Sequence, residues 1–209
     1  GNSKVMSTKE RIVEEALTLF SSRGYQGTSV KNIADAVGIK DSSLYKHFKS
    51  KKEIFETIVE EMARRMEAMS HTFGLPDDTT VEAAAFAYGV ISVEELVELS
   101  RKVFLFYLQD PFAGRFRRML TIEQYRDREI AAVYRKIYME DSIRYQTVLF
   151  EEMIRQGVFR EADARAMAIN FYAPIFFLLN KYDSPECSVE DGLEELERQV
   201  REFARIYHK

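Results

Sequence analysis

The chain has 209 residues, of which 46% are hydrophobic, and its formal net charge is −4. That composition is enough for one large domain or two small ones with a buried core. The sequence contains no run of about eighteen apolar residues and no signal peptide, so we expect a cytoplasmic protein without a membrane span. Cys187 is the single cysteine, which excludes an intrachain disulfide and fits a reducing cytosol.

Charge is distributed unevenly along the chain. Through Phe55 there are ten Lys or Arg residues and six Asp or Glu residues, which gives this part a net charge of +4. The remaining residues include twenty basic and twenty-eight acidic side chains, a net charge of −8. Positive potential at one end of a protein steers it onto the phosphates of nucleic acids. We therefore expect the N-terminal part to bind nucleic acid and the acidic remainder to avoid it.

Helical patterns begin near the N-terminus, and strand patterns are scarce throughout. The capping box Ser7–Glu10 predicts a first helix that extends to about residue 22. Thr28 is expected to cap a second, short helix, and Gly38 fits the left-handed position that ends it. The apolar positions of this second helix fall at helical spacing: Val30, Ile33, Ala34 and Val37.

A third, short helix is predicted directly after the glycine. Asp41 or Ser42 is expected to cap it. Leu44 and Phe48 are four residues apart, so both side chains face the core together. The remaining faces of this helix are left to polar and basic residues.

A helix, a glycine turn and a polar second helix form a helix-turn-helix pattern, whose second helix enters the major groove of DNA. Lysine reaches guanine O6 and N7, while hydroxyl and imidazole groups bind phosphate oxygens. The alternative is a small helical hairpin with a solvated basic face. The candidate DNA-binding residues are Thr28, Ser29, Lys40, Ser42, Ser43, Tyr45, Lys46, His47 and Lys51.

Longer helices are predicted in the rest of the chain. Ser50 and Glu53 form a capping box, which predicts a helix from about residue 51 to residue 73. Further helices are expected to begin near residues 79, 92, 112, 127, 163 and 188, and glycine or proline turns separate several of them. The predicted fold class is all-α.

A set of residues in the first quarter of the chain matches a known pattern: Arg11, Ile12, Ala16, Leu19, Phe20, Gly24, Tyr25, Gly27, Thr28, Ile33, Ala34, Gly38, Ser43, Leu44, Tyr45, His47, Phe48, Ser50, Lys51 and Phe55. With these residues the segment resembles the N-terminal DNA-binding domain of TetR-type transcriptional regulators. Lys40 departs from the pattern, since the family usually has a small residue there. The resemblance implies a homodimeric, ligand-responsive repressor that binds a palindromic DNA operator.

The resemblance also implies a domain organisation. We expect a helix-turn-helix DNA-binding domain at residues 1–52 and a helical-bundle domain for ligand binding and dimerisation at residues 53–209, with about nine helices in total. Ligand in the bundle is expected to move the helix predicted at residues 51–73, because that helix joins the two regions.

Two C-terminal segments have apolar residues on more than one face. Residues 166–179 are interrupted only by Asn170 and Pro174, and a second stripe lies on the helix predicted at 127–156. A helix that is apolar on all sides is buried on all sides, and the resemblance implies dimerisation through the last long helices. The alternative is an ordinary monomer core. The candidate interface residues are Ser142, Tyr145, Leu149, Met153, Tyr172 and Phe176.

The middle of the chain is rich in aromatic residues. The resemblance implies a cavity for a small-molecule effector in the bundle, and aromatic and methionine side chains suit an apolar or flat effector. The alternative is that these residues simply pack the core. The candidate pocket residues are Met66, Phe86, Phe104, Tyr107, Phe116, Met119 and Tyr125.

No pattern in the sequence predicts catalysis, a metal site or a cofactor. Glu67 and His71 are spaced to touch on a helix, but an exposed pair explains them better than a metal site does. The protein is therefore expected not to be an enzyme. The main alternative function is a helical small-molecule-binding or scaffold protein that recognises no specific operator, and a third is a cofactor-free enzyme in the acidic part.

Overall fold

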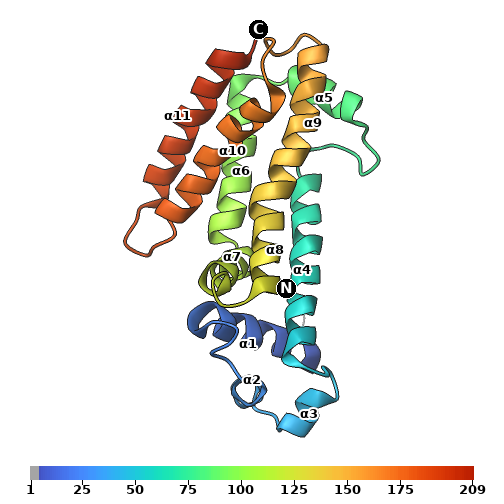
Figure 1. Ribbon diagram of the computed structural model, residues 1–209, viewed down its shortest axis with the longest axis vertical. Coiled ribbons are helices and arrows are strands. Elements are labelled where there is room, and N and C mark those ends of the chain that lie inside the picture. The colour runs from blue at the N-terminus through green and yellow to red at the C-terminus, as the bar shows by residue number, and fades with distance from the viewer. Residues whose placement is uncertain (1–4) are drawn as a thin grey trace. The chain divides into compact units, whose positions relative to one another are not determined.

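Helices build nearly all of the structure, as the all-α prediction required. The computed structural model describes residues 5–209, and within that range we find no strand beyond a single isolated bridge between Phe159 and His208. No helix in the same range is both long enough and apolar enough to cross a bilayer. The helices are α1 (Thr8–Arg23), α2 (Val30–Val37), α3 (Asp41–Tyr45), α4 (Lys51–His71), α5 (Val81–Gly89), α6 (Val93–Gln109), α7 (Pro111–Glu123), α8 (Arg128–Arg135), the π-helical turn η1 (Lys136–Glu140), α9 (Asp141–Arg155), α10 (Ala164–Lys181) and α11 (Val189–Tyr207). Figure 1 labels the α-helices.

The contacts of the chain divide it into two compact units. One unit, which we call the head, contains the residues up to Glu67 together with Pro111–Tyr134. The other, which we call the body, contains Ala68–Asp110 and Arg135–Lys209. The head thus extends beyond the boundary expected at residue 52, because it includes most of α4 and because α7 packs on α1. A separate domain at residues 1–52 stays a prediction.

Side-chain caps define the starts of several helices as predicted. The Ser7 hydroxyl accepts a hydrogen bond from the Glu10 N–H at 3.1 Å, which begins α1. The Ser50 hydroxyl accepts one from the Glu53 N–H at 3.1 Å, which begins α4 at Lys51. Each bond pairs an N–H group that has no partner within the helix.

Two predicted caps are wrong. The cap of α2 is Ser29, not Thr28: the Ser29 hydroxyl accepts from the Asn32 N–H at 3.0 Å, and the Asn32 side-chain oxygen accepts from the Ser29 N–H at 2.9 Å. The usual capping-box pattern has Glu or Gln where this chain has Asn32, so the pattern did not predict this capping box. Neither Asp41 nor Ser42 caps α3, which begins without a side-chain cap.

The core of the head is formed by α1 to α4 together with α7. The Arg11 guanidinium donates to the Val37 carbonyl at 2.6 Å and so ties α1 to the last turn of α2. Because that carbonyl ends a helix, the bond satisfies a group that would otherwise lack a partner. The following side chains of the head core are at most 1% exposed: Ile12, Leu17, Phe20, Ile33, Ala34, Leu44, Phe48, Ile54 and Ile58.

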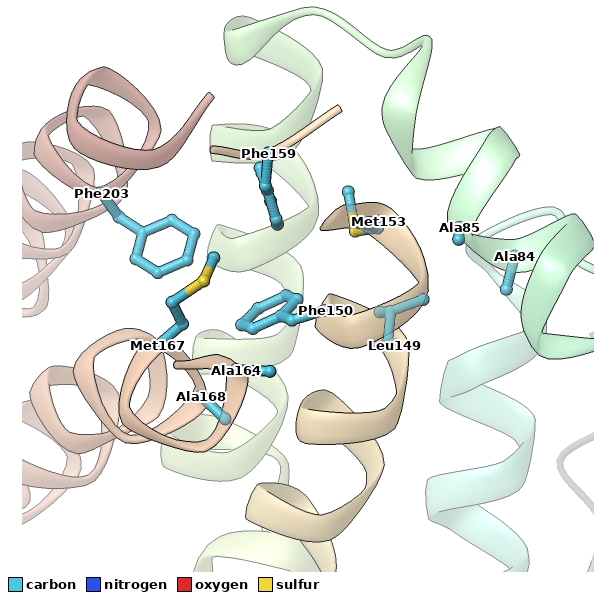
Figure 2. Packing of buried hydrophobic residues seen from close by; sticks show 10 residues of the cluster. All are labelled: Ala84, Ala85, Leu149, Phe150, Met153, Phe159, Ala164, Met167, Ala168 and Phe203. Atoms are coloured by element: carbon cyan, nitrogen blue, oxygen red, sulfur yellow. The ribbon is translucent and has the colours of Figure 1, made fainter. Parts of the chain in front are cut away.

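The body is a bundle in which α10 packs against α9 and α11, and α11 packs against α6 (Figure 1). Figure 2 shows that Phe150, Phe159, Phe203 and Met167 point toward one another in this bundle. The ring centroids of Phe150 and Phe159 are 5.4 Å apart, and those of Phe150 and Phe203 are 5.6 Å apart. Aromatic pairs at these spacings stabilise a core beyond their buried area.

Candidate nucleic-acid interface and body cavity

The turn between α2 and α3 has the geometry that the sequence predicted. Gly38 lies in the left-handed region with φ 84° and ψ 32°, and its N–H donates to the Ala34 carbonyl at 2.9 Å. The Ile39 N–H donates to the same carbonyl at 3.0 Å. A residue with a Cβ is disfavoured in this conformation, so glycine permits the sharp turn that leads into α3.

The helix α3 buries one face and exposes the others. Leu44 and Phe48 are 0% and 1% exposed, which confirms that they face the core. Tyr45 is 52% exposed although it is a large aromatic side chain. Seven of the nine candidate DNA-binding residues are on the accessible surface in or near α2 and α3: Ser29, Lys40, Ser42, Tyr45, Lys46 and His47 are exposed, and Ser43 is half-buried.

The other two candidate DNA-binding residues direct their side chains into the head. Thr28 is 1% exposed, and its hydroxyl donates to the Gly24 carbonyl at 2.9 Å. The Lys51 ammonium donates to the Tyr25 carbonyl at 2.8 Å and to the Thr28 carbonyl at 3.1 Å. It also lies 4.1 Å from the centre of the Tyr25 ring, and burial lowers the pKa of Lys51. Both side chains hold the segment between α1 and α2.

The helix α7 supports this segment from a distant part of the sequence. The Glu123 side chain is fully buried, and a Cβ on Gly24 would lie 2.2 Å from its carboxylate oxygen. The Gln26 amide donates to the Arg126 carbonyl at 2.9 Å. Arg115 and Glu14 form an ion pair at 2.6 Å. Sequence patterns missed these residues because the pairs are separated by about a hundred positions and leave no local signal.

The body encloses an apolar cavity of about 210 Å³. Its walls come from α6, α9, α10 and α11, together with the segments around Tyr88 and Phe159. A concave, mainly apolar space with few polar groups is the usual form of a small-molecule site. Representative apolar lining residues are Leu96, Leu99, Val103, Phe150, Phe171 and Ile175.

None of the seven candidate pocket residues lines this cavity. Four of them belong to the head: Met66, Phe116, Met119 and Tyr125. Phe116 and Met119 are fully buried in the core there, whereas Tyr125 is 90% exposed.

The other three candidate pocket residues lie in the body, away from the cavity wall. Phe86 is 66% exposed, and Phe104 is fully buried in a cluster with Leu178. Tyr107 packs edge-on against Tyr138, with ring centroids 6.1 Å apart. Richness in aromatic residues was therefore a poor guide to the wall. A better signal was available in the helical spacing of the aliphatic residues Leu96, Leu99 and Val103.

The candidate interface residues are divided between the inside and the surface of the body. Leu149 and Met153 are 7% and 4% exposed, and both line the cavity. The Tyr172 hydroxyl donates to the Tyr138 carbonyl within the body. Tyr145 is 55% exposed.

The remaining two candidates, Ser142 and Phe176, are half-buried. A different set of apolar residues lies on the outer face of α10: Ile169 is 43% exposed and Phe177 is 60% exposed, with the exposed Ala173 between them. These three residues are four apart and therefore share one face of the helix.

A buried helical core that presents a short, polar second helix after a glycine turn defines the head as a helix-turn-helix unit. Residues 12–58 match the family described as bacterial regulatory proteins, tetR family. The match covers the helix-turn-helix segment, so this segment is similar to the DNA-binding segment of that family.

Two curated relatives match about a quarter of this chain. IcaR of Staphylococcus aureus, the negative transcriptional regulator of the biofilm operon icaADBC, is 53% identical over 51 residues, which cover 24% of this chain and 27% of IcaR. IcaR of Staphylococcus epidermidis is 46% identical over 52 residues, which cover 25% of this chain and 28% of that protein. The match thus spans about a quarter of the length of these relatives.

Solved structures resemble the whole chain. A protein assigned to the TetR family from Mesorhizobium loti has a TM-score of 0.69 with 17% identity, and the match covers 97% of each chain. A SmeT–triclosan complex has a TM-score of 0.66 with 21% identity and covers 98% of this chain and 93% of SmeT. At these identities the likeness establishes the fold, which is that of TetR-type regulators.

Proposed function

We propose that this protein is a DNA-binding transcriptional regulator that acts as a homodimeric repressor and responds to a small-molecule effector. The observation that carries the proposal is the exposed polar surface of α3, supported on a tightly packed helix-turn-helix in a basic N-terminal segment. Positive potential concentrates this surface near DNA, and side chains on a helix that enters the major groove read base edges.

The exposed residues have distinct roles in the proposed complex. Lys46 reaches guanine O6 and N7, while Ser42, Tyr45 and His47 contact phosphates. Ser29, at the N-terminus of α2, is placed to bind a phosphate where helix N–H groups already favour an anion. Thr28 and Lys51 act indirectly, by holding the segment that precedes α2.

Two copies of the head are needed to read a palindromic operator. Their recognition helices then lie about 34–36 Å apart, one helical turn of DNA between half-sites. The exposed face of α10, formed by Ile169, Ala173 and Phe177, supplies an apolar surface for the second copy. Repression is favoured over activation because the relative IcaR is a negative regulator and is 53% identical to this chain over 51 residues.

Control by an effector follows from the course of α4. This helix belongs to the head up to Glu67 and to the body from Ala68 onward. A ligand that favours one position of its body end therefore biases the position of its head end. The similar fold of SmeT was solved as a complex with triclosan, a precedent for a small molecule in a protein of this architecture. Catalysis has no role in this scheme.

The test of DNA binding is a selection from random duplexes with the purified chain, followed by salt titration of the enriched duplex. We expect one palindromic sequence to be enriched and the affinity to fall steeply with salt. Lys46→Ala should remove about 1–3 kcal/mol of preference for the enriched duplex over an unrelated one. The slope of log affinity against log salt concentration should change little, by at most about one released counterion.

Lys102→Ala is the matched control, because Lys102 is an exposed lysine of the body. It should leave both quantities unchanged. If no duplex is bound at low salt, the alternative of a ligand-binding or scaffold protein without operator recognition replaces the proposal. Salt-dependent binding without any sequence preference would likewise exclude a specific operator.

A further inference from the structure

One polar atom in the wall of the body cavity has no partner in the fold. The side-chain oxygen Oε1 of Gln146, on α9, is buried and accepts no hydrogen bond from the described residues. A buried acceptor without a partner in the chain is costly, so a bound molecule that donates a hydrogen bond to it would be stabilised. We propose that the cavity takes an uncharged small molecule with an apolar part and a single hydrogen-bond donor, which pairs with Gln146 Oε1.

The size of the cavity limits its occupant to a small molecule. An apolar cavity of about 150 Å³ holds a benzene ring. The body cavity, at about 210 Å³, is somewhat larger and is lined chiefly by aliphatic and aromatic side chains such as Leu99, Phe150 and Ile175. One ring with a short alkyl chain fills such a space, and its burial provides most of the affinity.

Three other polar groups in the wall are already engaged within the chain. The Ser100 hydroxyl donates to the Leu96 carbonyl at 2.9 Å. The Tyr172 hydroxyl donates to the Tyr138 carbonyl. The Ser92 hydroxyl accepts from the N–H of Glu95 at the start of α6. Gln146 Oε1, in contrast, is a buried acceptor that no bond within the described residues satisfies.

The charge of the wall excludes an ionic occupant. Among the lining residues of the described chain there is no Asp, Glu, Lys or Arg, and the one imidazole, that of His208, is exposed. Burial raises the pKa of Tyr88 to about 12, so this phenol stays neutral. A charged ligand group would lose its hydration here without gaining an opposite charge.

This inference rests on the proposed function in one respect: it assumes that the molecule bound in the cavity is the effector. Its test uses calorimetry on the full-length protein with three probes that share a propylphenyl group: 4-propylphenol, its methyl ether 4-propylanisole, and 4-propylbenzoate. The phenol donates a hydrogen bond, the ether does not, and the benzoate is an anion. We expect the phenol to bind about tenfold more tightly than the ether, and the benzoate to bind more weakly than both.

Gln146→Leu removes the acceptor while keeping a side chain of similar size. In this variant the preference for phenol over ether should fall below about threefold. The unliganded variant should also melt about 2–4 °C higher than the wild type, because the unpaired oxygen is gone. The matched control is Gln199→Leu, the same change at an exposed position of α11 outside the cavity, which should keep the full preference.

Three results would overturn the proposal. They are equal binding of phenol and ether by the wild type, a preference that persists in Gln146→Leu, and no binding of any of the three probes. The proposed function has a separate readout in the affinity for the selected duplex. If the phenol binds through Gln146 but leaves DNA affinity unchanged, the cavity assignment stands and the effector-control scheme fails. If DNA is bound but no probe is, the cavity assignment alone fails.

Discussion

The head and the body bury their apolar residues differently. In the head, Ile33, Leu44 and Phe48 are at most 1% exposed. In the body, residues such as Leu99 and Val103 face a cavity of about 210 Å³. A close-packed core holds a surface in one shape, which suits a helix that must match the groove of DNA. A core with a cavity can instead bind a ligand in the unfilled volume.

The comparisons differ in how much sequence they share with this chain. IcaR is 53% identical over a 51-residue match, whereas the whole-chain neighbour from Mesorhizobium loti keeps the fold with 17% identity. A surface that contacts DNA constrains individual side chains, whereas a helical bundle constrains mainly the pattern of apolar positions. Many different sequences can therefore produce a helical bundle of this kind.

The largest effect is expected from truncation in the head. Phe48→Ala should lower the free energy of unfolding by about 3–5 kcal/mol, since Phe48 is 1% exposed and the close-packed surroundings cannot collapse into the space. Denaturant titration of the purified variant measures this change. The matched control is Tyr45→Ala on the same helix, where the ring is 52% exposed and the expected change is within about 0.5 kcal/mol. Similar losses in both variants would contradict the packing contrast within α3.

Enlarging a buried side chain should change the stability differently in the two units. Ala34→Leu adds three carbons at a fully buried position of the head and should cost about 1–3 kcal/mol of stability. Val103→Leu adds one carbon toward the cavity and should leave stability unchanged or raise it by up to about 1 kcal/mol. Thermal melts of both variants make the comparison. A loss in Val103→Leu equal to that in Ala34→Leu would mean that the cavity cannot accept added volume.

The smallest expected effect concerns the body at alkaline pH. Burial raises the pKa of Tyr107 to about 12 from its ordinary value of 10. Between these values the unfolded chain loses the phenol proton while the folded chain keeps it, so stability falls as the pH rises from 10 toward 12. The loss should reach about 1 kcal/mol at pH 11. Tyr107→Phe should remove it.

Urea titrations at pH 9 and pH 11 measure this loss. Many other groups titrate in the same range, so the quantity of interest is the difference between wild type and Tyr107→Phe at each pH. Tyr125→Phe, at a position that is 90% exposed, is the control for the substitution itself. A pH-independent difference for Tyr107→Phe would show that the ring does not remain buried in solution.

Local chemistry in the sequence was sufficient to predict the helix-turn-helix. Gly38 is needed for a left-handed turn, Ser50 caps the helix that follows, and the spacing of Leu44 and Phe48 assigns the buried face of α3. These effects act over one or two helical turns, so a pattern of neighbouring residues contains them in full. The errors were also local: Ser29 and Asn32 cap α2, because a serine with asparagine provides the same pair of bonds as the expected capping box.

Tertiary structure alone decided which residues line the cavity and which support the head. Gln146 and Val103 are 43 positions apart and share one wall, and Glu123 lies against Gly24 from 99 positions away. Helical periodicity predicts that a residue is buried. It does not predict whether that residue contacts another side chain or lines a cavity. That outcome depends on how several helices pack together and on the volume that their side chains leave unfilled.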